Sequence, residues 1–297
     1  MYKELAIIAP TASSKTALSI KLAHKLNAVI LSLDSLAVYK EIDIASAKPT
    51  LKERDGIIHF GIDKVYPNEF FDVIEFIEEY KVAKEYAIKN GKNMIIVGGT
   101  GFYLKAMIEG LSKTPKLSEK TKISVAEQLL NLDRTYKLLS DIDSKYMSKI
   151  ASNDRYRIQR VLEIYVETSL TPTEYFEQNK PDPIINNINI FQIETQPDIL
   201  RERIKQRTKQ MISNGIIDEV IYLEENYTRE PNCMGSIGIK ESLEYLDGKI
   251  DRLKLEELIS IHTAQLAKRQ RTFNRSQFTN IFSEVLENLE NKILSMV

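Results

Sequence analysis

The sequence of 297 residues predicts an α/β protein in which a parallel, doubly wound sheet flanked by helices is interrupted by an inserted all-helical subdomain. Two observations predict this architecture. Short apolar runs that end in turns alternate with segments of helical periodicity, as buried parallel strands alternate with crossover helices. This alternation stops between residues 113 and 183, where helical periodicity continues without a convincing buried strand.

The first 112 residues account for one part of the sheet. The expected elements are, in chain order, a strand at residues 5–9, a helix from about Thr16, a strand at 28–33, a helix over 72–90, a strand at 94–97 and a helix after the turn 98–101. The helix over 72–90 has an apolar face and is followed by Gly91, and glycine commonly ends a helix. The alternation predicts parallel strands whose carboxyl ends share one edge.

The chain after residue 183 is expected to complete the sheet, since Pro181 and Pro183 mark the end of the helical subdomain. The elements expected there are a strand at 188–193, helices from Pro197 to Asn226 and from Leu253 to Asn274, and a short strand at 279–282. The prediction is a core made of residues 1–112 and 184–297, with residues 113–183 as the inserted subdomain.

The composition excludes several classes of protein. Lys and Arg (41) nearly balance Asp and Glu (42), so any basic surface for a nucleic acid must be local. The single cysteine, Cys233, allows no intrachain disulfide, and no segment approaches the roughly 20 apolar residues of a membrane span. His24, His59 and His262 show no metal-ligand spacing, so we expect no zinc site. We expect a cytoplasmic monomer without a membrane partner.

Residues 9–16, Ala-Pro-Thr-Ala-Ser-Ser-Lys-Thr, lie between the first strand and the first helix, where a phosphate-binding P-loop would lie. Backbone N–H groups at a helix N-terminus attract phosphate, Lys15 adds a charge, and Thr16 can bind Mg²⁺. Both glycines of the usual pattern are replaced, by Ala9 and Ser14. A plain strand-turn-helix capped by a serine therefore remains an alternative.

Two other polar turns follow predicted strands. Asp34 and Ser35 end the strand at 28–33, and Thr100 lies in the Gly-Gly-Thr-Gly turn that follows the strand at 94–97. At the carboxyl edge of a parallel sheet, a carboxylate can act as a general base and a threonine can bind a phosphate or a nucleobase. The alternatives are structural: Asp34 or Ser35 could cap a helix, and the glycines could serve only a tight turn.

Three basic clusters stand out in a chain that is neutral overall. They lie at residues 154–160, at residues 201–209 and at residues 268–275. Most charge runs are solvated helix faces. Three clusters, one with an interleaved tyrosine at position 156, nevertheless favour a groove that binds RNA.

Taken together, these segments resemble the bacterial tRNA dimethylallyltransferase (isopentenyltransferase) family. The matching segments are residues 9–16, Asp34-Ser35 with Tyr39, 43–49, 97–103, Asn153-Asp154 with Arg157 and Arg160, 207–211, 236–241 and 265–270. Their order agrees with the family from the first strand to about Arg275, nearly the whole chain. A small-molecule kinase would share only the phosphate loop.

The chain also departs from the family pattern. The family usually has glycine at positions 9, 14 and 41, Gly-Thr at 45–46, arginine at 240 and tryptophan at 273, where this chain has Ala9, Ser14, Glu41, Ala45-Ser46, Lys240 and Phe273. Loss of the planar arginine fork at position 240 weakens bidentate recognition there. The changes in the phosphate loop concern affinity for a diphosphate more than identity.

The resemblance implies a P-loop NTPase-like fold and a defined reaction. Family members transfer the dimethylallyl group of dimethylallyl diphosphate to N6 of the adenine on the 3′ side of the anticodon in tRNA. The reaction uses Mg²⁺ and releases diphosphate. The implied partners are therefore dimethylallyl diphosphate and the anticodon stem-loop of a tRNA, which the inserted subdomain would bind.

The resemblance also implies roles for individual residues. The catalytic residues would be Asp34 as general base, Thr100 as an orienting residue and Arg207 as a cation on the leaving group. The diphosphate would be bound by Thr11, Ala12, Ser13, Ser14, Lys15 and Thr16, with Mg²⁺ on Thr16. The tRNA would contact Asp34, Ser35, Leu36, Ala37, Thr100, Tyr156, Arg157, Ile158, Gln159, Arg160, Ser236, Ile237, Gly238 and Lys240.

Three alternatives stay open. A P-loop phosphotransferase acting on a small molecule would turn over ATP without RNA, but it leaves the insertion unexplained. A non-catalytic RNA-binding relative would fit the missing loop glycines, whereas the retained Lys15, Asp34 and Arg207 argue against it. A prenyltransferase acting on free adenine nucleotides is disfavoured by the basic insertion.

Overall fold

The computed structural model describes residues 2–297, and the chain forms two compact units. One unit, here called the core unit, comprises Met1–Ala106 and Ile185–Val297; the other, the helical unit, comprises Met107–Ile184. The insertion expected at residues 113–183 lies within the helical unit.

The core unit is built on a six-stranded parallel sheet. Its strands are β1 (Glu4–Ile8), β2 (Ala28–Leu33), β3 (His59–Phe60), β4 (Asn93–Gly98), β5 (Asn189–Glu194) and β6 (Ile281–Val285), in the order β3-β2-β4-β1-β5-β6. In the register, Ala6 of β1 lies between Ile96 of β4 and Ile190 of β5. The predicted fold class is confirmed. No strand was expected at β3, because its two half-buried residues are too short a run to form a pattern.

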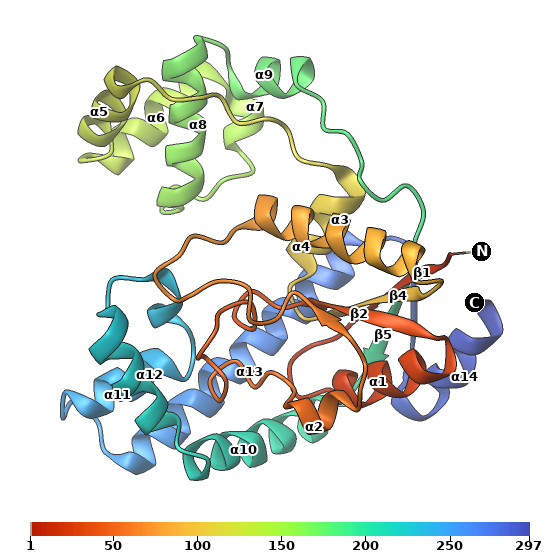
Figure 1. Ribbon diagram of the computed structural model, residues 1–297. Helices are drawn as coiled ribbons and strands as arrows, with labels where there is room; N and C mark the ends of the chain where they lie inside the picture. Colours follow the sequence, from red (N-terminus) through yellow and green to blue (C-terminus); the bar gives the residue numbers. More distant parts are fainter. Residues whose placement is uncertain (1) are drawn as a thin grey trace. The chain divides into compact units, whose positions relative to one another are not determined.

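Helices cover both faces of the sheet (Figure 1). One face carries α1 (Lys15–Lys25) and α14 (Leu286–Met296), whose apolar side chains share a cluster with β1, β2, β4 and β5. The other face carries α3 (Val73–Lys89) and α4 (Gly101–Glu109), which meet where Phe76 stacks on Tyr103. The apolar strands predicted from the sequence are thus buried on both faces, as parallel strands usually are.

The remaining elements of the core unit are mostly C-terminal. They are α2 (Leu51–Arg54), α10 (Pro197–Ser213), α11 (Ile216–Tyr227), a 3₁₀ turn η1 (Asn232–Gly235), α12 (Ile239–Leu246) and α13 (Arg252–Gln277). The stretch from Pro197 to Asn226 is helical, as expected, but it is divided between α10 and α11. It breaks at Gly215, which has a φ of +94°, a conformation that favours glycine. Gly215 is the residue before a separate helix, α11.

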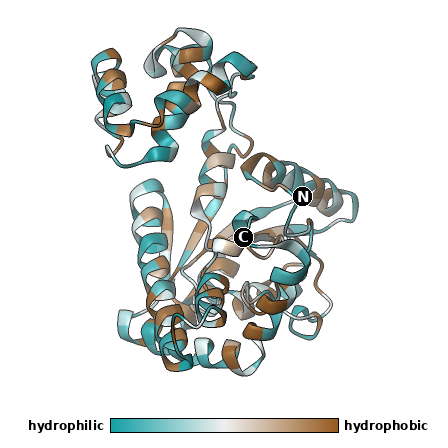
Figure 2. Ribbon diagram, turned by 90° about the vertical axis from the view of Figure 1, so that its left-hand side faces the viewer, coloured by the Kyte–Doolittle hydropathy of each residue, from teal (hydrophilic) through white to brown (hydrophobic). Residues whose placement is uncertain are grey.

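The helical unit contains α5 (Glu119–Gln128), α6 (Leu132–Ile142), α7 (Ser144–Met147), α8 (Arg155–Thr168) and α9 (Pro172–Gln178). Its own core gathers apolar side chains around Ile158 and Leu162 of α8. Asp154 caps α8 by accepting a hydrogen bond from the Arg157 N–H. Hydrophilic and hydrophobic residues alternate along its helices, as amphipathic packing requires (Figure 2).

Two expectations from composition can be compared with the structure. Cys233 is buried and has a free thiol. Over residues 2–297, no helix combines the length and apolar character that crossing a bilayer demands.

Candidate active site

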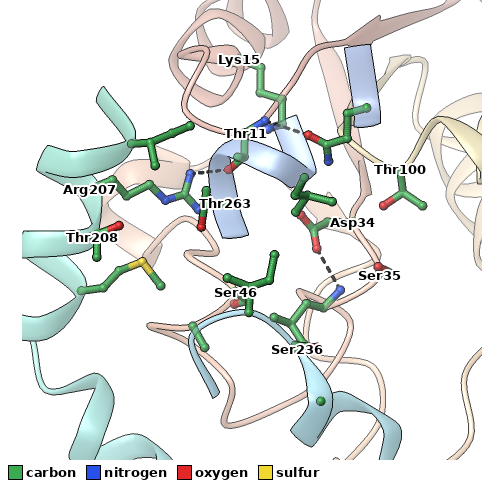
Figure 3. Close-up of a pocket in the computed structure, with 18 residues that line it drawn as sticks. Thr11, Lys15, Asp34, Ser35, Ser46, Thr100, Arg207, Thr208, Ser236 and Thr263 are labelled. Carbon is green, nitrogen blue, oxygen red and sulfur yellow. Dashed lines mark hydrogen bonds between the residues drawn. The ribbon is translucent and has the colours of Figure 1, made fainter. Parts of the chain in front are cut away.

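The carboxyl ends of β1, β2 and β4 open onto one cavity of about 300 Å³ (Figure 3). Its lining includes Thr11, Lys15, Asp34, Ser35, Leu36, Thr100, Arg207, Ser236, Ile237 and Gln270. Asp34 and Thr100 lie on the side of the cavity opposite Arg207 (Figure 3). These residues come from six separate stretches of the chain, which therefore meet at the sheet edge where parallel α/β proteins bind ligands.

The phosphate loop, residues 9–16, turns directly from β1 into α1. Ala12 and Ser14 adopt the left-handed conformation, with φ of 62° and 66°. The Ser14 hydroxyl makes no capping hydrogen bond, so the capped-turn alternative lacks its defining contact. Ala9 differs from Ser14: it has no positive φ, is fully buried and donates its N–H to the Gly98 carbonyl at 3.2 Å. Of the two absent glycines, only the one at position 14 concerns backbone conformation.

We expect Ser14→Gly to change the dissociation constant for inorganic diphosphate by less than about threefold, or roughly 0.6 kcal/mol. Ser14 holds the left-handed conformation that a glycine would adopt there, so we expect its strain of about 1 kcal/mol in the free and the bound loop alike. Isothermal titration calorimetry of the two proteins measures the difference. Tightening by tenfold or more would show that the loop is remodelled when diphosphate binds.

Two cations converge on the cavity. Burial and the nearby Arg207 together lower the pKa of Lys15 to about 8, while Asp34 acts in the opposite direction. Burial also lowers the pKa of Arg207, against the attraction of Asp34. Arg207 donates from Nη1 to the Thr11 hydroxyl at 3.1 Å, whereas Lys15 has no ion-pair or hydrogen-bond partner within residues 2–297. Two desolvated positive charges side by side are a strong site for an anion.

We expect kcat/KM for dimethylallyl diphosphate, the substrate implied by the resemblance, to fall as the pH rises through about 8. The pKa of Lys15 in the free enzyme lies below its ordinary value, so alkaline solution removes the charge that binds the diphosphate before the substrate arrives. Initial rates at low substrate concentration, measured from neutral to alkaline pH, give the profile. The limb should be absent in Lys15→Met, and a wild-type profile that stays flat through pH 8 would contradict the assignment.

Asp34 is held by its own turn. Its Oδ1 accepts hydrogen bonds from the backbone N–H groups of Leu36 at 2.9 Å and Ala37 at 3.2 Å. Residues 35–37 form turns and no helix, so Asp34 caps no helix, which removes the structural alternative. The bonded oxygen fixes the side chain, and the carboxylate faces the cavity that Lys15 and Arg207 share (Figure 3).

The Gly-Gly-Thr-Gly turn packs tightly against α13. A Cβ atom at Gly99 would overlap the Gln270 side-chain amide, and one at Gly101 would overlap Asn274. Gln270 in turn accepts a hydrogen bond from the Thr11 N–H at 3.0 Å. The two glycines therefore allow α13 to pack close to the site. Thr100 donates its N–H to the Leu33 carbonyl and lines the cavity.

The apolar wall of the cavity was missed in the sequence. It is formed by Ala45, Ile204, Met211 and Leu266, with Thr208 and Thr263 beside them. On α10, the positions 204, 208 and 211 follow helical spacing between the basic residues. That stripe was a usable signal for a second functional face on a helix of which only Arg207 was assigned a role.

The residues expected to contact tRNA fall into three groups. Ser35, Leu36, Ser236 and Ile237 line the cavity, and Lys240 is exposed on α12. Ala37 and Gly238 are buried in the core unit, and Gly238 donates its N–H to Glu241. In the helical unit, Tyr156, Arg157 and Arg160 are exposed, and Gln159 is half-buried. Ile158 is 0 % exposed in that unit's core, so its side chain cannot contact RNA, because the helix turns it inward.

Thr16 opens onto a second cavity, of about 700 Å³, next to Arg207 and Lys48. Within the described chain its hydroxyl has no hydrogen-bond partner. No cluster of three or more His, Cys, Asp or Glu side chains suited to a metal occurs among residues 2–297. A free hydroxyl oxygen at the phosphate loop fits Mg²⁺, because Mg²⁺ keeps several waters and binds through few protein oxygens and substrate phosphates.

Comparison with known proteins gives one consistent result. The sequence model of the IPP transferase family matches residues 37–277. The tRNA dimethylallyltransferase of Aliarcobacter butzleri is 57% identical over 292 residues, which cover 98% of each chain. The protein of the same name from Sulfurovum sp. is 54% identical over 98% of this chain and 97% of its own.

Solved structures agree over the full length. The tRNA isopentenylpyrophosphate transferase of Bacillus halodurans is 29% identical, with a TM-score of 0.73 over 100% of this chain and 95% of its own. A eukaryotic dimethylallyltransferase acting on tRNA is 28% identical, with a TM-score of 0.84 over 99% of this chain and 78% of its own.

Proposed function

The chain belongs to the IPP transferase family, and from that premise we propose that it is a tRNA dimethylallyltransferase. It transfers the dimethylallyl group of dimethylallyl diphosphate to the exocyclic N6 of the adenine 3′-adjacent to the anticodon and releases diphosphate. The observation that carries this proposal is the single cavity in which Lys15 and Arg207 face Asp34 and Thr100. One side suits a diphosphate and the other suits a nucleophile that must lose a proton.

The diphosphate binds on the phosphate loop. The N–H groups at the start of α1 point toward its oxygens, and the positive end of the helix dipole adds to the charges of Lys15 and Arg207. Negative charge grows on the diphosphate as its bond to the allylic carbon breaks. Cations that are already in place and desolvated stabilise that charge without reorganisation.

The adenine amine is a weak nucleophile because its lone pair is delocalised into the ring. N6 attacks the allylic C1 carbon, the C1–O bond breaks with its electron pair going to the diphosphate, and one N6 proton passes to Asp34. An adenine stacked in an RNA loop cannot reach this cavity, so the base must be flipped out to react. Thr100, beside Asp34, orients the base or the diphosphate.

Magnesium fits the phosphate-loop end of the site. The Thr16 hydroxyl, together with diphosphate oxygens, would hold the ion, which would supply further charge neutralisation to the leaving group. Arg207 lines both this second cavity and the cavity that contains Asp34, so its guanidinium can contact the diphosphate from either cavity.

The tRNA is proposed to bind partly through the helical unit. Exposed Tyr156 and Arg157 stand on the first turn of α8, and the Arg160 guanidinium lies 5.4 Å from the Tyr156 ring centre. An aromatic ring backed by guanidinium groups can stack on a base while the charges bind phosphates. Such binding should weaken as salt concentration rises.

Prenyl transfer is the experiment that tests the proposal. The pure protein is incubated with Mg²⁺, dimethylallyl diphosphate and an unmodified tRNA that has adenine 3′ to its anticodon. The RNA is then digested, and the nucleosides are analysed by mass spectrometry. We expect the isopentenyl nucleoside with tRNA and no product with free AMP.

The other outcomes identify the alternatives. Product with AMP would assign the chain to prenyltransferases of free nucleotides. ATP turnover without RNA would assign it to phosphotransferases. Tight tRNA binding without product would make it a binding protein that has lost its chemistry.

A further inference from the structure

The segment of residues 43–48 has no regular secondary structure, yet it lines three cavities that meet the phosphate loop. Ala45 and Ser46 line the 300 Å³ cavity, and Asp43, Ile44, Ala47 and Lys48 line the 700 Å³ cavity. A third cavity, of about 70 Å³ behind Lys15, is lined by Ser46, Ala47 and Lys48. The segment is made of turns, so helix or strand bonding does not fix its backbone.

One carboxylate from another part of the chain holds this backbone. Glu219 of α11 accepts three hydrogen bonds from consecutive N–H groups: Asp43 at 2.8 Å and Ile44 at 2.6 Å on Oε2, and Ala45 at 2.9 Å on Oε1. Both oxygens of the carboxylate are therefore used. Hydrogen bonds to an ionised acceptor are about twice as strong as neutral ones.

The other anchor of the segment acts from the opposite end. The Lys48 ammonium is nearly buried, donates to the Tyr39 carbonyl at 2.8 Å and pairs with Asp43 and Asp63. The Ser46 hydroxyl turns back to the Ile42 carbonyl. Lys48 thus links the two ends of the segment, whereas Glu219 holds the three consecutive N–H groups of Asp43, Ile44 and Ala45.

We propose that Glu219 is a positioning residue, which sets the place of Ala45 and Ser46 against the phosphate loop and thereby the affinity for dimethylallyl diphosphate. The proposal rests on the proposed function for its substrate. Without the carboxylate, three backbone N–H groups lose their partner together, and the segment can drift from Lys15 and Thr16. The tRNA should be affected little, because its expected contacts outside the cavity do not depend on residues 43–45.

The variant Glu219→Gln tests the proposal. Glutamine keeps one acceptor oxygen, but its NH₂ group would face a backbone N–H, so at least one of the three hydrogen bonds is lost. We expect KM for dimethylallyl diphosphate to rise about tenfold, with KM for tRNA unchanged. Amide hydrogen exchange of the full-length protein, followed by mass spectrometry, should become faster in the peptide that holds residues 43–45.

The matched control is Glu225→Gln, which changes an exposed glutamate on the same helix and should behave as the wild type. Glu219→Asp keeps the charge on a shorter side chain and should fall between the wild type and Glu219→Gln. If Glu219→Gln fails to fold, Glu219→Asp carries the same test. A purely structural role would lower the melting temperature and leave KM for dimethylallyl diphosphate at its wild-type value.

Two results would overturn the proposal: exchange at residues 43–45 that is unchanged in Glu219→Gln, or faster exchange with an unchanged KM. Hydrogen exchange needs no prenyl transfer, and neither does the dissociation constant for inorganic diphosphate, which should rise in Glu219→Gln as KM does. A wild-type protein without transferase activity would therefore count against the proposed function, while these two measurements would still decide the role of Glu219.

Discussion

Asp34→Asn is expected to lower kcat for prenyl transfer by about 10³-fold, within the range for loss of a general base. Asparagine keeps the oxygen that accepts from the Leu36 and Ala37 N–H groups, so the turn should survive. What it loses is the capacity to accept the N6 proton. Single-turnover rates with saturating dimethylallyl diphosphate and tRNA measure the step directly.

The same substitution should leave diphosphate binding intact or tighten it. Asp34 is a negative charge near Lys15 and Arg207, and its removal favours a second anion at those cations. This opposite effect separates lost chemistry from damaged folding. The control is Asp198→Asn on the exposed surface of α10, which should keep full activity. Turnover of Asp34→Asn within about threefold of wild type would refute the base assignment, because a general base contributes far more.

Lys15→Met is expected to reduce kcat/KM for dimethylallyl diphosphate by about 10³-fold while making the empty protein more stable. Methionine fills the same space without a charge, so the leaving group loses one of its two cations. The folded protein, however, no longer has to bury an unpaired ammonium group. Because burial lowers the pKa of Lys15 to about 8, this burial costs about 3 kcal/mol at neutral pH.

The sign of the pH dependence follows from that lowered pKa. Below pH 8 Lys15 is charged in both the folded and the unfolded chain, and its full burial penalty is present. Above pH 8 the folded protein releases the proton while the unfolded chain keeps it. The free energy of unfolding of the wild type therefore rises toward that of the variant. The melting temperatures of the wild type and Lys15→Met should therefore differ at neutral pH and converge at alkaline pH. An exposed lysine, Lys89→Met, serves as control, and a variant less stable than wild type at neutral pH would contradict the account.

The sequence predicted the parts of the fold that depend on local pattern. The strand at 28–33 agrees with β2 residue for residue, because its apolar run is buried on both faces and ends at Asp34. The break at Gly215 was missed, since the apolar spacing of α11 continues that of α10 closely enough to look like one helix. The helix α14 was missed because it has few apolar residues. Those it has, such as Leu289, are buried only by packing against the sheet, which the sequence does not show.

The site could be predicted only where a residue type reveals its chemistry. Lys15, Asp34 and Arg207 carry charge and occur in recognisable motifs, and the structure brings them to one cavity. Glu219 could not be found in this way. A glutamate on an amphipathic helix is typical of a solvated face, and its bonds to residues 43–45 exist only through tertiary structure.

The contact between Thr11 and Gln270 has a consequence for folding during translation. The phosphate loop leaves the ribosome early, but the helix that supports it and closes the Gly99 turn comes 259 positions later. Both edges of strand β1 are likewise paired only after β5 has been synthesised, because β1 lies between β4 and β5. A nascent chain can therefore hold the loop sequence without holding a working site. The protein becomes able to modify RNA only after Gln270 has been translated.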